Sequence, residues 1–309
     1  MANIRNILIM GGGMMGKNIA FVFSSCKDYN ITIYDINSVD IEGGIRVNTK
    51  QLVEKGIVTP DELNERLSRI SFTQDIDSEG VKSADFVIEA VFEDMKLKQD
   101  TFAKLEARCS KECIFCTNTS VMSPSEISQN LKYRDRFCGT HFWNPGHLIP
   151  LVEVVKTDAT TDATADTVME VLTKVGKKPC LCKKDVPGFI ANRLQHALWR
   201  EAISIVEHGI ADAETVDIAI KNSFGLRLPQ LSPMENADLC GTDLTLSIHK
   251  YVLPYLEDSH EPSPLLVELN NEGKLGFKTG EGFQKWTPEQ MKSCGENLNT
   301  YLIRMLYGK

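Results

Sequence analysis

Two residues between positions 137 and 155 have the types and spacing of an acid–base pair. His141 ends the apolar run FCGTH, and Glu153 lies inside the apolar run LVEVV, with a Pro-bounded loop between the two runs. This pattern predicts a strand, a loop and a second strand. A carboxylate buried in the second strand needs a partner, and a histidine that ends a neighbouring strand supplies one. Glu153 would then fix the tautomer of His141 for general acid–base catalysis at a hydroxyl group, although the spacing also allows an exposed Glu153 on an edge strand.

A glycine-rich turn follows the first predicted strand, residues 4–10. The run GGGMMG places Gly11, Gly13 and Gly16 in the pattern G-x-G-x-x-G, and a helical run follows directly. The first glycine permits the tight turn, the second lets the backbone approach a pyrophosphate, and the third lets the helix pack closely on the strand. Free N–H groups at the start of the helix would bind the phosphates, and Met14 and Met15 lie in the same turn. This pattern is typical of a dinucleotide-binding βαβ unit.

The second predicted strand, ITIYD, ends in Asp35. An acid about 20 residues beyond such a glycine turn accepts hydrogen bonds from the ribose hydroxyls. The same carboxylate would repel a 2′-phosphate, so we predict NAD rather than NADP as the cofactor. A turn aspartate before Asn37 is the alternative interpretation of this residue.

Strands and helices alternate along the first part of the chain. Further strands are predicted at residues 70–73, 86–91 and 113–117, and helices at 40–68, 94–109 and 123–131. The alternation predicts an α/β fold with a Rossmann-like, doubly wound and mainly parallel sheet. Ligands bind outside the carboxyl ends of such strands, where residues 91–93, residues 118–120 and His141 fall.

After a strand predicted at residues 178–182, the pattern becomes helical. The helical runs cover residues 187–208, 212–222, 243–256, 263–272 and 288–306. We therefore predict an NAD-binding Rossmann-like domain at 1–186 and an all-helical substrate and dimerisation domain at 187–309. The apolar face from Ile190 to Ile205 is larger than one small helical unit needs, so we expect a homodimer formed through this domain.

Length and composition limit the possible functions. The chain of 309 residues is long enough for two cores, with 42% hydrophobic and 25% charged residues. A formal net charge of -8, without any basic run, argues against nucleic acid or an anionic membrane as partner. A strand close to the N-terminus and the lack of a long apolar run predict a cytoplasmic protein without a leader peptide. The nine cysteines lack the spacing of a metal site, so we expect reduced thiols and no metal.

Several longer motifs follow one another in a definite order. They are GGGMMG with Asp35, VIEAVFEDMKLK, NTS, HFWNP, LVEVV, PGFIANRL and KLGFKTGEGF. In these motifs, and along nearly its whole length, the sequence resembles the NAD-dependent 3-hydroxyacyl-CoA dehydrogenase family. The resemblance implies a Rossmann-like domain followed by a helical dimerisation domain. It also implies an oxidoreductase of fatty acid metabolism that interconverts a short-chain 3-hydroxyacyl-CoA, such as 3-hydroxybutyryl-CoA, and the 3-ketoacyl-CoA.

The resemblance further implies roles for individual residues. His141 would be the catalytic base and Glu153 its orienting partner, while Ser120 and Asn192 would hydrogen-bond the reacting oxygen. Glu93 and Lys98 would lie near the nicotinamide. The complete set of predicted cofactor contacts is Gly11, Gly13, Met14, Met15, Gly16, Asp35, Ala90, Val91, Glu93, Lys98, Asn118 and Ser120. The predicted substrate contacts are Ser120, His141, Asn144, Asn192, Lys50 and Lys55.

Two departures from the family pattern concern the substrate. The common NTSS reads NTSV here, and the loop after HFWNP reads GHLIP where acyl-CoA enzymes often carry a methionine–lysine pair. The runs IPLVE and FEDMKLK are similar to the gulonate dehydrogenase and lambda-crystallin branch, whose substrates carry no CoA. Lys50 and Lys55 would meet CoA phosphates, or would simply lie on a solvated face. The alternatives left open are a dehydrogenase of a carboxylate-bearing alcohol without CoA, and a crystallin-like protein that binds NADH without turnover.

Overall fold

The computed structural model describes residues 4–308, which divide into two compact units. The first unit runs up to Ala191 and takes up the chain again from Asn297, and the second spans Asn192–Glu296. The division therefore falls slightly later than the predicted one after residue 186. A larger difference lies near the C-terminus, where the chain returns to the first unit instead of staying with the helical one.

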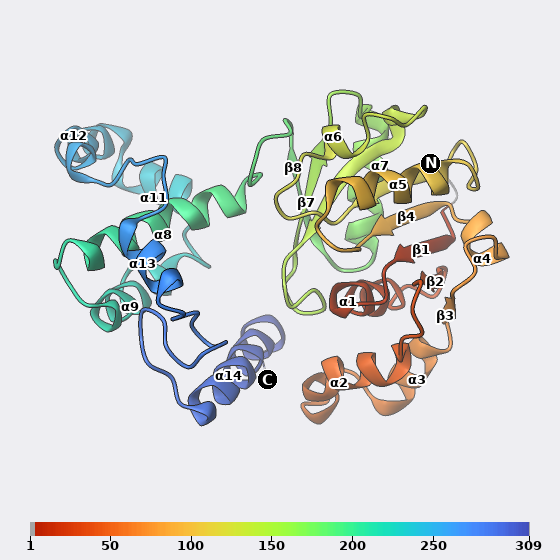
Figure 1. Cartoon of the computed structure of the whole chain (residues 1–309), viewed down its shortest axis with the longest axis horizontal. Helices are drawn as coiled ribbons and strands as arrows, with labels where there is room; N and C mark the ends of the chain where they lie inside the picture. Colours follow the sequence, from red (N-terminus) through yellow and green to blue (C-terminus); the bar gives the residue numbers. More distant parts are fainter. Residues whose placement is uncertain (1–3, 309) are drawn as a thin grey trace. The chain divides into compact units, whose positions relative to one another are not determined.

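The first unit is built on one 8-stranded sheet with the order β3-β2-β1-β4-β5-β6-β7-β8 (Figure 1). Neighbouring strands are parallel except for β6 and β7, which are antiparallel. The strands are β1 Asn6–Met10, β2 Asn30–Tyr34, β3 Ile70–Thr73, β4 Phe86–Glu89, β5 Ile114–Thr117, β6 Phe137–Phe142, β7 Leu151–Lys156 and β8 Lys178–Cys182. The strand order reverses between β1 and β4, which is the switch point where such folds bind ligands. The predicted Rossmann-like, mainly parallel sheet is confirmed.

Alternate side chains of β1 enter two different hydrophobic cores, one on each face of the sheet. Ile7 and Ile9 belong to one cluster, and Leu8 and Met10 belong to the other. Helices α1 and α7 contribute to the first cluster and α5 to the second. The helices of this unit are α1 Met14–Phe23, α2 Ile41–Glu54, α3 Pro60–Leu67, α4 Glu79–Lys82, α5 Met95–Glu106, α6 Pro124–Ile127, the 3-10 helix Arg134–Arg136 and α7 Asp162–Lys174. The sequence pattern predicts neither α4 nor α7.

Local sequence explains where the predicted helices begin. The hydroxyl oxygens of Thr59 and Ser123 accept hydrogen bonds from N–H groups in the first turns of α3 and α6. Proline follows each cap at the start of the helix, where its missing N–H costs nothing. Strand β4 ends at Glu89, earlier than predicted, and two residues later the N–H of Val91 donates to the Glu89 carboxylate at 2.7 Å.

The second unit is helical (Figure 1). Its elements, of which the first and last cross the unit boundaries, are α8 Ala191–Glu207, α9 Ala213–Lys221, α10 Phe224–Arg227, α11 Pro233–Cys240, α12 Thr242–Val252, the 3-10 helix Leu253–Tyr255, α13 Pro264–Asn271 and α14 Pro288–Tyr307. The predicted all-helical character is confirmed, and α10 and α11 add to the predicted helices. Between α13 and α14, isolated bridges join Glu281 to Gly276 and to Lys285.

Helix α14 connects the two units as one continuous helix. Its residues from Asn297 onward belong with the first unit. Ile303 is buried there, in the hydrophobic cluster that also contains Phe23 and Leu172, and Leu302 is partly buried against the same cluster. The burial of this apolar pair explains why the end of the chain departs from the predicted division into domains.

Candidate active site

The antiparallel pairing of β6 and β7 brings the predicted acid–base pair together. His141 lies directly opposite Glu153 in the register of the two strands. The distance between His141 Nδ1 and Glu153 Oε2 is 2.8 Å, and both residues are buried. The alternative of an exposed Glu153 on an edge strand is wrong, because β8 pairs with the other side of β7.

Glu153 accepts four hydrogen bonds and is therefore a fully satisfied buried carboxylate. The Trp143 Nε1–H donates to Oε2 at 3.2 Å, and the backbone N–H groups of Ile190 and Ala191 donate to Oε1 at 2.9 Å each. These two N–H groups stand at the start of α8, where the helix leaves donors unpaired. Burial alone would raise the pKa of Glu153, but the bonds from His141, from the two N–H groups and from Trp143 together hold it below its ordinary value. The carboxylate is thus kept ionised beside the imidazole.

Two aromatic rings flank the imidazole of His141. The ring centroid of Trp143 lies 5.5 Å from that of His141, and the centroid of Phe189 lies at 5.7 Å. Phe189 is buried and has a φ of 50°, a conformation that a bulky residue rarely adopts. The segment that leads into α8 is therefore held against the histidine at a cost in backbone strain, which such sites commonly carry.

The glycine turn has the geometry of a dinucleotide site. Gly11 has a φ of 107°, and a Cβ at this position would lie 2.7 Å from the carbonyl oxygen of Ala90. A Cβ on Gly16 would lie 1.8 Å from the carbonyl oxygen of Gly11, so helix and strand approach each other as the motif predicts. A Cβ on Gly13 would meet nothing within 4 Å. Gly13 precedes the first turn of α1 and leaves space for a pyrophosphate at that helix terminus.

Asp35 lies directly after β2, and its carboxylate supports the glycine turn. One carboxylate oxygen accepts the N–H of Gly12 at 2.8 Å, and the other accepts the N–H of Asn37 at 2.9 Å. The alternative of a turn aspartate before Asn37 is thus part of the observed geometry. Each oxygen keeps a further lone pair that can accept a ribose hydroxyl.

A second buried carboxylate, Glu89, stands at the carboxyl end of β4 and was not predicted as a site residue. Its two oxygens accept from Lys98 Nζ and Thr117 Oγ1, each at 2.7 Å. Lys98 also lies 3.2 Å from Glu93, which in turn accepts the backbone N–H of Ser120 at 2.7 Å. The predicted residues Glu93, Lys98 and Ser120 are therefore joined in one network, and Glu89 is its anchor.

The remaining predicted residues lie in different surroundings. The Asn118 side chain accepts the N–H of Phe142 at 2.9 Å and so links the end of β5 to β6. Asn144 is exposed in the loop after β6, and Asn192 belongs to the helical unit. The predicted residues Met14 and Met15 begin helix α1, and Ala90 and Val91 directly follow β4.

The two lysines predicted to meet CoA phosphates lie near the end of α2. Lys50 is exposed and forms an ion pair with Glu54 at 3.6 Å, and Lys55 caps the end of the helix. This helix follows β2, which β1, β4 and β5 separate from β6 in the sheet. No hydrogen bond or ion pair found within residues 4–308 connects either lysine with the His141–Glu153 pair.

A buried cation that sequence reasoning missed holds the loop between β6 and β7. Lys177 Nζ donates to the carbonyl oxygens of Gly146 and Ile149, at 2.6 and 2.8 Å, and lies over the ring of Phe142. Burial lowers the pKa of Lys177 to about 8. Burial and the nearby lysine charge lower the pKa of His147, in the same loop, to about 4. By binding these two carbonyl groups, Lys177 fixes the loop that carries Asn144.

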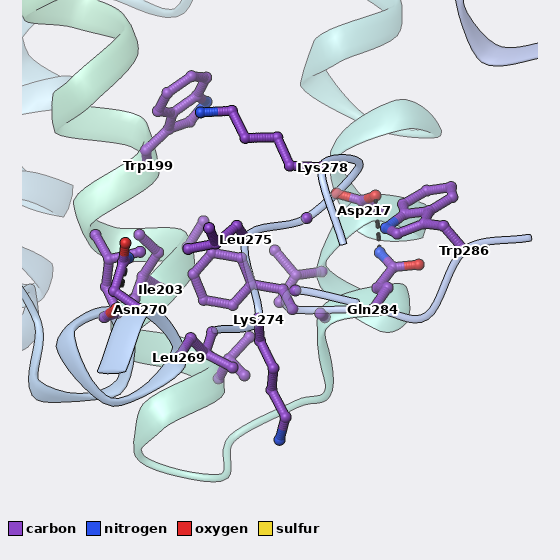
Figure 2. Close-up of a pocket in the computed structure, with 18 residues that line it drawn as sticks. Trp199, Ile203, Asp217, Leu269, Asn270, Lys274, Leu275, Lys278, Gln284 and Trp286 are labelled. Carbon is purple, nitrogen blue, oxygen red and sulfur yellow. Dashed lines mark hydrogen bonds between the residues drawn. The ribbon is translucent and has the colours of Figure 1, made fainter. Parts of the chain in front are cut away.

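A cavity of about 590 Å³ lies within the helical unit (Figure 2). Its lining is mainly apolar and comes from α8, α9, α13 and the turns between residues 274 and 286. Figure 2 shows Asp217 hydrogen-bonded to Gln284 and the Lys278 side chain extended toward Trp199. Lys278 belongs to the motif KLGFKTGEGF, but none of the predicted site residues lines the cavity.

The described part of the chain shows no cluster suited to a metal ion. Within residues 4–308, no group of three or more His, Cys, Asp or Glu side chains could hold one. All nine cysteines are free thiols, and Cys116 and Cys138 meet at 3.8 Å between their sulfurs. No helix within residues 4–308 is long and apolar enough to cross a membrane.

Comparison with family models identifies the fold and the type of enzyme. Residues 6–186 match the NAD binding domain of 3-hydroxyacyl-CoA dehydrogenase, and residues 188–286 match its C-terminal domain. The chain belongs to the 3-hydroxyacyl-CoA dehydrogenase family. It is therefore an NAD-dependent oxidoreductase of that type, and the predicted cofactor NAD is confirmed.

Relatives within the family have different substrates in their names. The chain is 32% identical over 293 residues to 5-formyl-3-hydroxy-2-methylpyridine 4-carboxylate 5-dehydrogenase of Mesorhizobium japonicum, covering 94% of this chain and 93% of that one. It is 34% identical over 292 residues to the mitochondrial hydroxyacyl-coenzyme A dehydrogenase of Homo sapiens, covering 92% and 91%. A crystal structure of the pyridine carboxylate dehydrogenase, described as an NAD+ dependent dismutase, superposes with a TM-score of 0.89 at 31% identity and covers 99% of both chains.

Proposed function

We propose that the chain interconverts a hydroxyl group and a carbonyl group by hydride exchange with NAD, using His141 and Glu153 as its acid–base pair. The observation that carries the proposal is the 2.8 Å contact between His141 Nδ1 and Glu153 Oε2, in a site where the carboxylate is kept ionised. A carboxylate that receives a hydrogen bond from Nδ1 leaves Nε2 unprotonated. Nε2 can then take a proton from a substrate hydroxyl.

In the proposed oxidation, residues of this chain move the proton and stabilise the charges that develop. His141 takes the hydroxyl proton at Nε2 while the carbon–oxygen bond becomes a carbonyl, and Glu153 stabilises the imidazolium that results. NAD, when held in the glycine-turn site, would supply the acceptor for the hydride that leaves the same carbon. The Ser120 hydroxyl and the Asn192 amide are the proposed donors to the substrate oxygen, where charge develops as the proton leaves. In the reverse direction His141 returns the proton and a ketone is reduced.

The cofactor contacts proposed for this chain follow from the same part of the structure. The start of α1 beyond Gly13 would hold the pyrophosphate, and Asp35 would accept a ribose hydroxyl. The network of Glu93 and Lys98 would hold the nicotinamide end, because it stands at the carboxyl end of β4 beside Ser120.

For the substrate, the first candidate is a short-chain 3-hydroxyacyl-CoA such as 3-hydroxybutyryl-CoA. It is supported by the family models, which match both domains, and by the motif KLGFKTGEGF. Lys50 and Lys55 are the proposed contacts for CoA phosphates, which at Lys50 requires that CoA displace the ion pair with Glu54.

The second candidate is an alcohol or aldehyde that carries a carboxylate and no CoA. The specific observation in its favour is that the pyridine carboxylate dehydrogenase structure superposes on this chain with a TM-score of 0.89 and covers 99% of both chains. The GHLIP loop, without the methionine–lysine pair of many acyl-CoA enzymes, points the same way.

The test is the formation of NADH when the protein and NAD are mixed with 3-hydroxybutyryl-CoA, free 3-hydroxybutyrate, or a hydroxymethyl-substituted aromatic carboxylate. NADH formation with the thioester alone supports the first candidate, and NADH formation with either free acid alone supports the second. Tight NADH binding without turnover on any of them would contradict both and support a crystallin-like binding protein.

We also propose a homodimer formed through the helical unit, and a cytoplasmic location. Large apolar side chains are exposed on the helices of that unit, and a second copy would cover them. Examples are Leu194, Ile218, Leu244, Leu246 and Ile248. Light scattering at micromolar concentration should give the mass of a dimer, and the mass of a monomer would contradict the proposal.

A further inference from the structure

Trp143 is a side-chain donor to Glu153 whose role neither the motifs nor the proposed chemistry assigns. Its indole Nε1–H donates to Glu153 Oε2 at 3.2 Å, and this same oxygen holds His141 Nδ1 at 2.8 Å. The other carboxylate oxygen is occupied by two backbone N–H groups. Trp143 and His141 therefore share one oxygen of a buried carboxylate.

We propose that Trp143 is a positioning residue, which sets both the orientation of His141 and the proton affinity of the His141–Glu153 pair. The inference rests on the proposed function of that pair and adds a residue to it. The indole acts in two ways, through its N–H on Glu153 and through its ring, which lies at an interplanar angle of 51° to the imidazole.

The N–H governs how much negative charge Glu153 presents to the imidazole. A donor on the shared oxygen disperses part of that charge, and in a water-excluded site such competition is felt strongly. Without the indole N–H, the same carboxylate would bind an imidazolium more tightly. The pair would then keep its extra proton up to a higher pH, and less of the enzyme would have a free base at neutral pH.

The ring governs where the imidazole can turn. Trp143 and Phe189 both stand within 5.7 Å of the imidazole, measured between ring centroids, and the Nδ1 contact fixes its edge. A smaller side chain at position 143 opens space on one side and lets the imidazole leave the plane in which it meets the carboxylate. Loss of the ring therefore predicts a lower kcat in addition to the shift in pH dependence.

Other titratable groups face Glu153 from the neighbouring strand β8. Cys180 lies opposite Glu153 in the strand register, and Cys182 follows on the same face. Burial raises the pKa of both thiols, helped by the negative charge of Glu153, so they stay neutral near pH 7. The donors from α8 are backbone N–H groups, which do not titrate. A shift near neutral pH would therefore report the His141–Glu153 pair.

The experiment compares Trp143→Phe with Trp199→Phe, which removes an indole from the helical unit instead. The first measurement is an NMR titration of histidine-labelled, cofactor-free protein. It gives the pH at the midpoint of the chemical-shift change of the His141 ring carbon. The midpoint should rise by roughly 0.5–1 pH unit in Trp143→Phe, as expected for loss of a hydrogen bond to a charged group, and should not move in Trp199→Phe. The same midpoint in both variants would overturn the proposal.

The second measurement is the acid limb of kcat/KM for the substrate identified in the activity test. It should move in the same direction in Trp143→Phe, with KM for NAD unchanged. Since the resonance titration needs no turnover, it still decides the role of Trp143 if the protein oxidises none of the substrates offered, which would count against the proposed function alone.

A third variant separates the N–H from the ring. Site-specific replacement of Trp143 by benzothienylalanine keeps the size of the indole but replaces its N–H by sulfur. The titration midpoint should rise as far as in Trp143→Phe, while kcat at high pH should stay closer to that of the unchanged protein. A rise in Trp143→Phe alone would show that packing and not the hydrogen bond sets the proton affinity, which contradicts the proposal.

Discussion

Two carboxylates are fully buried in the sheet of the first unit, and their partners differ. Glu153 meets an imidazole, an indole N–H and two backbone N–H groups. Glu89 meets the ammonium of Lys98, the hydroxyl of Thr117 and one backbone N–H. Burial raises the pKa of Glu89, against the effects of Lys98 and its two other donors, whereas the donors around Glu153 outweigh burial and lower its pKa.

The difference shows that the partner, rather than burial, decides what a buried acid can do. The Glu89–Lys98 ion pair is a fixed part of the scaffold, because Lys98 also contacts Glu93, which in turn accepts the backbone N–H of Ser120. The partner of Glu153 is an imidazole, a group that serves as a general acid or base in many enzymes. The cluster around Glu89 therefore positions Glu93 and the backbone of Ser120, whereas the pair of His141 and Glu153 has the groups that proton transfer needs.

The largest expected effect separates the two clusters by rate. His141→Ala should lower kcat by about 10²–10⁴-fold, because the base is lost while the fold stays intact. Glu89→Gln, which leaves His141 and Glu153 in place, should lower kcat of the folded protein much less than His141→Ala does. NADH formation per folded molecule, with folding checked by circular dichroism, measures both. Near-normal turnover by His141→Ala would contradict the distinction.

The second expected effect separates the clusters by stability. Glu89→Gln leaves Lys98 buried with only Glu93 as an acidic partner. We expect a loss of roughly 2–3 kcal/mol in the free energy of unfolding, somewhat less than for a buried charge left without any partner. Glu153→Gln should cost less, since an amide oxygen can still accept the two N–H groups of α8. Urea unfolding curves of the two variants give the comparison, and an equal or reversed order would contradict it.

The sequence predicts some parts of this arrangement and not others. The pairing of His141 with Glu153 follows from two short apolar runs joined by a loop, because this pattern favours neighbouring strands in register. The roles of Gly11 and Gly16 could be predicted from the pattern G-x-G-x-x-G. The structure gives the reason for the pattern, because neighbouring atoms leave no room for a Cβ at either position. The backbone N–H groups of Ile190 and Ala191 could not be predicted as donors to Glu153. Nothing in the sequence PGFIANRL shows that its backbone reaches strand β7.

Other missed features share this cause. Trp143 stands within the quoted motif HFWNP, and its polar edge could have signalled a partner, but its direction depends on the loop geometry. Glu89 is a single acid in an apolar strand, a pattern as clear as that of Glu153. Its partner Lys98 comes from a helix and not from a neighbouring strand, so the strand pattern does not predict the pair. The return of α14 to the first unit rests on Ile303, one apolar residue among many in an amphipathic helix.

The smallest expected effect concerns the loop between β6 and β7. There the buried ammonium of Lys177 is bound by backbone carbonyl oxygens and not by a carboxylate. Because the pKa of His147 is lowered from 6.5 to about 4, the unfolded chain binds a proton there that the folded protein does not, over that pH range. Stability should therefore fall, on the order of 1–2 kcal/mol, as the pH drops from 6.5 towards 4.

A matched pair of variants isolates this contribution. His147→Asn should remove it, and His249→Gln, at an exposed position of the helical unit, should retain it. The measurement is the free energy of unfolding in urea across the pH range. An unchanged slope in His147→Asn would show that the loop histidine is not held neutral by burial and Lys177.

The most direct test of the account is a double-mutant cycle on the acid–base pair. Kinetic constants for NADH formation would be measured for His141→Ala, Glu153→Gln and the protein with both changes. If Glu153 acts only through His141, the double variant should be no slower than His141→Ala, because groups that act as one unit are strongly non-additive. Losses that multiply in the double variant would mean that the two residues act separately, and would contradict the pair as the centre of the chemistry.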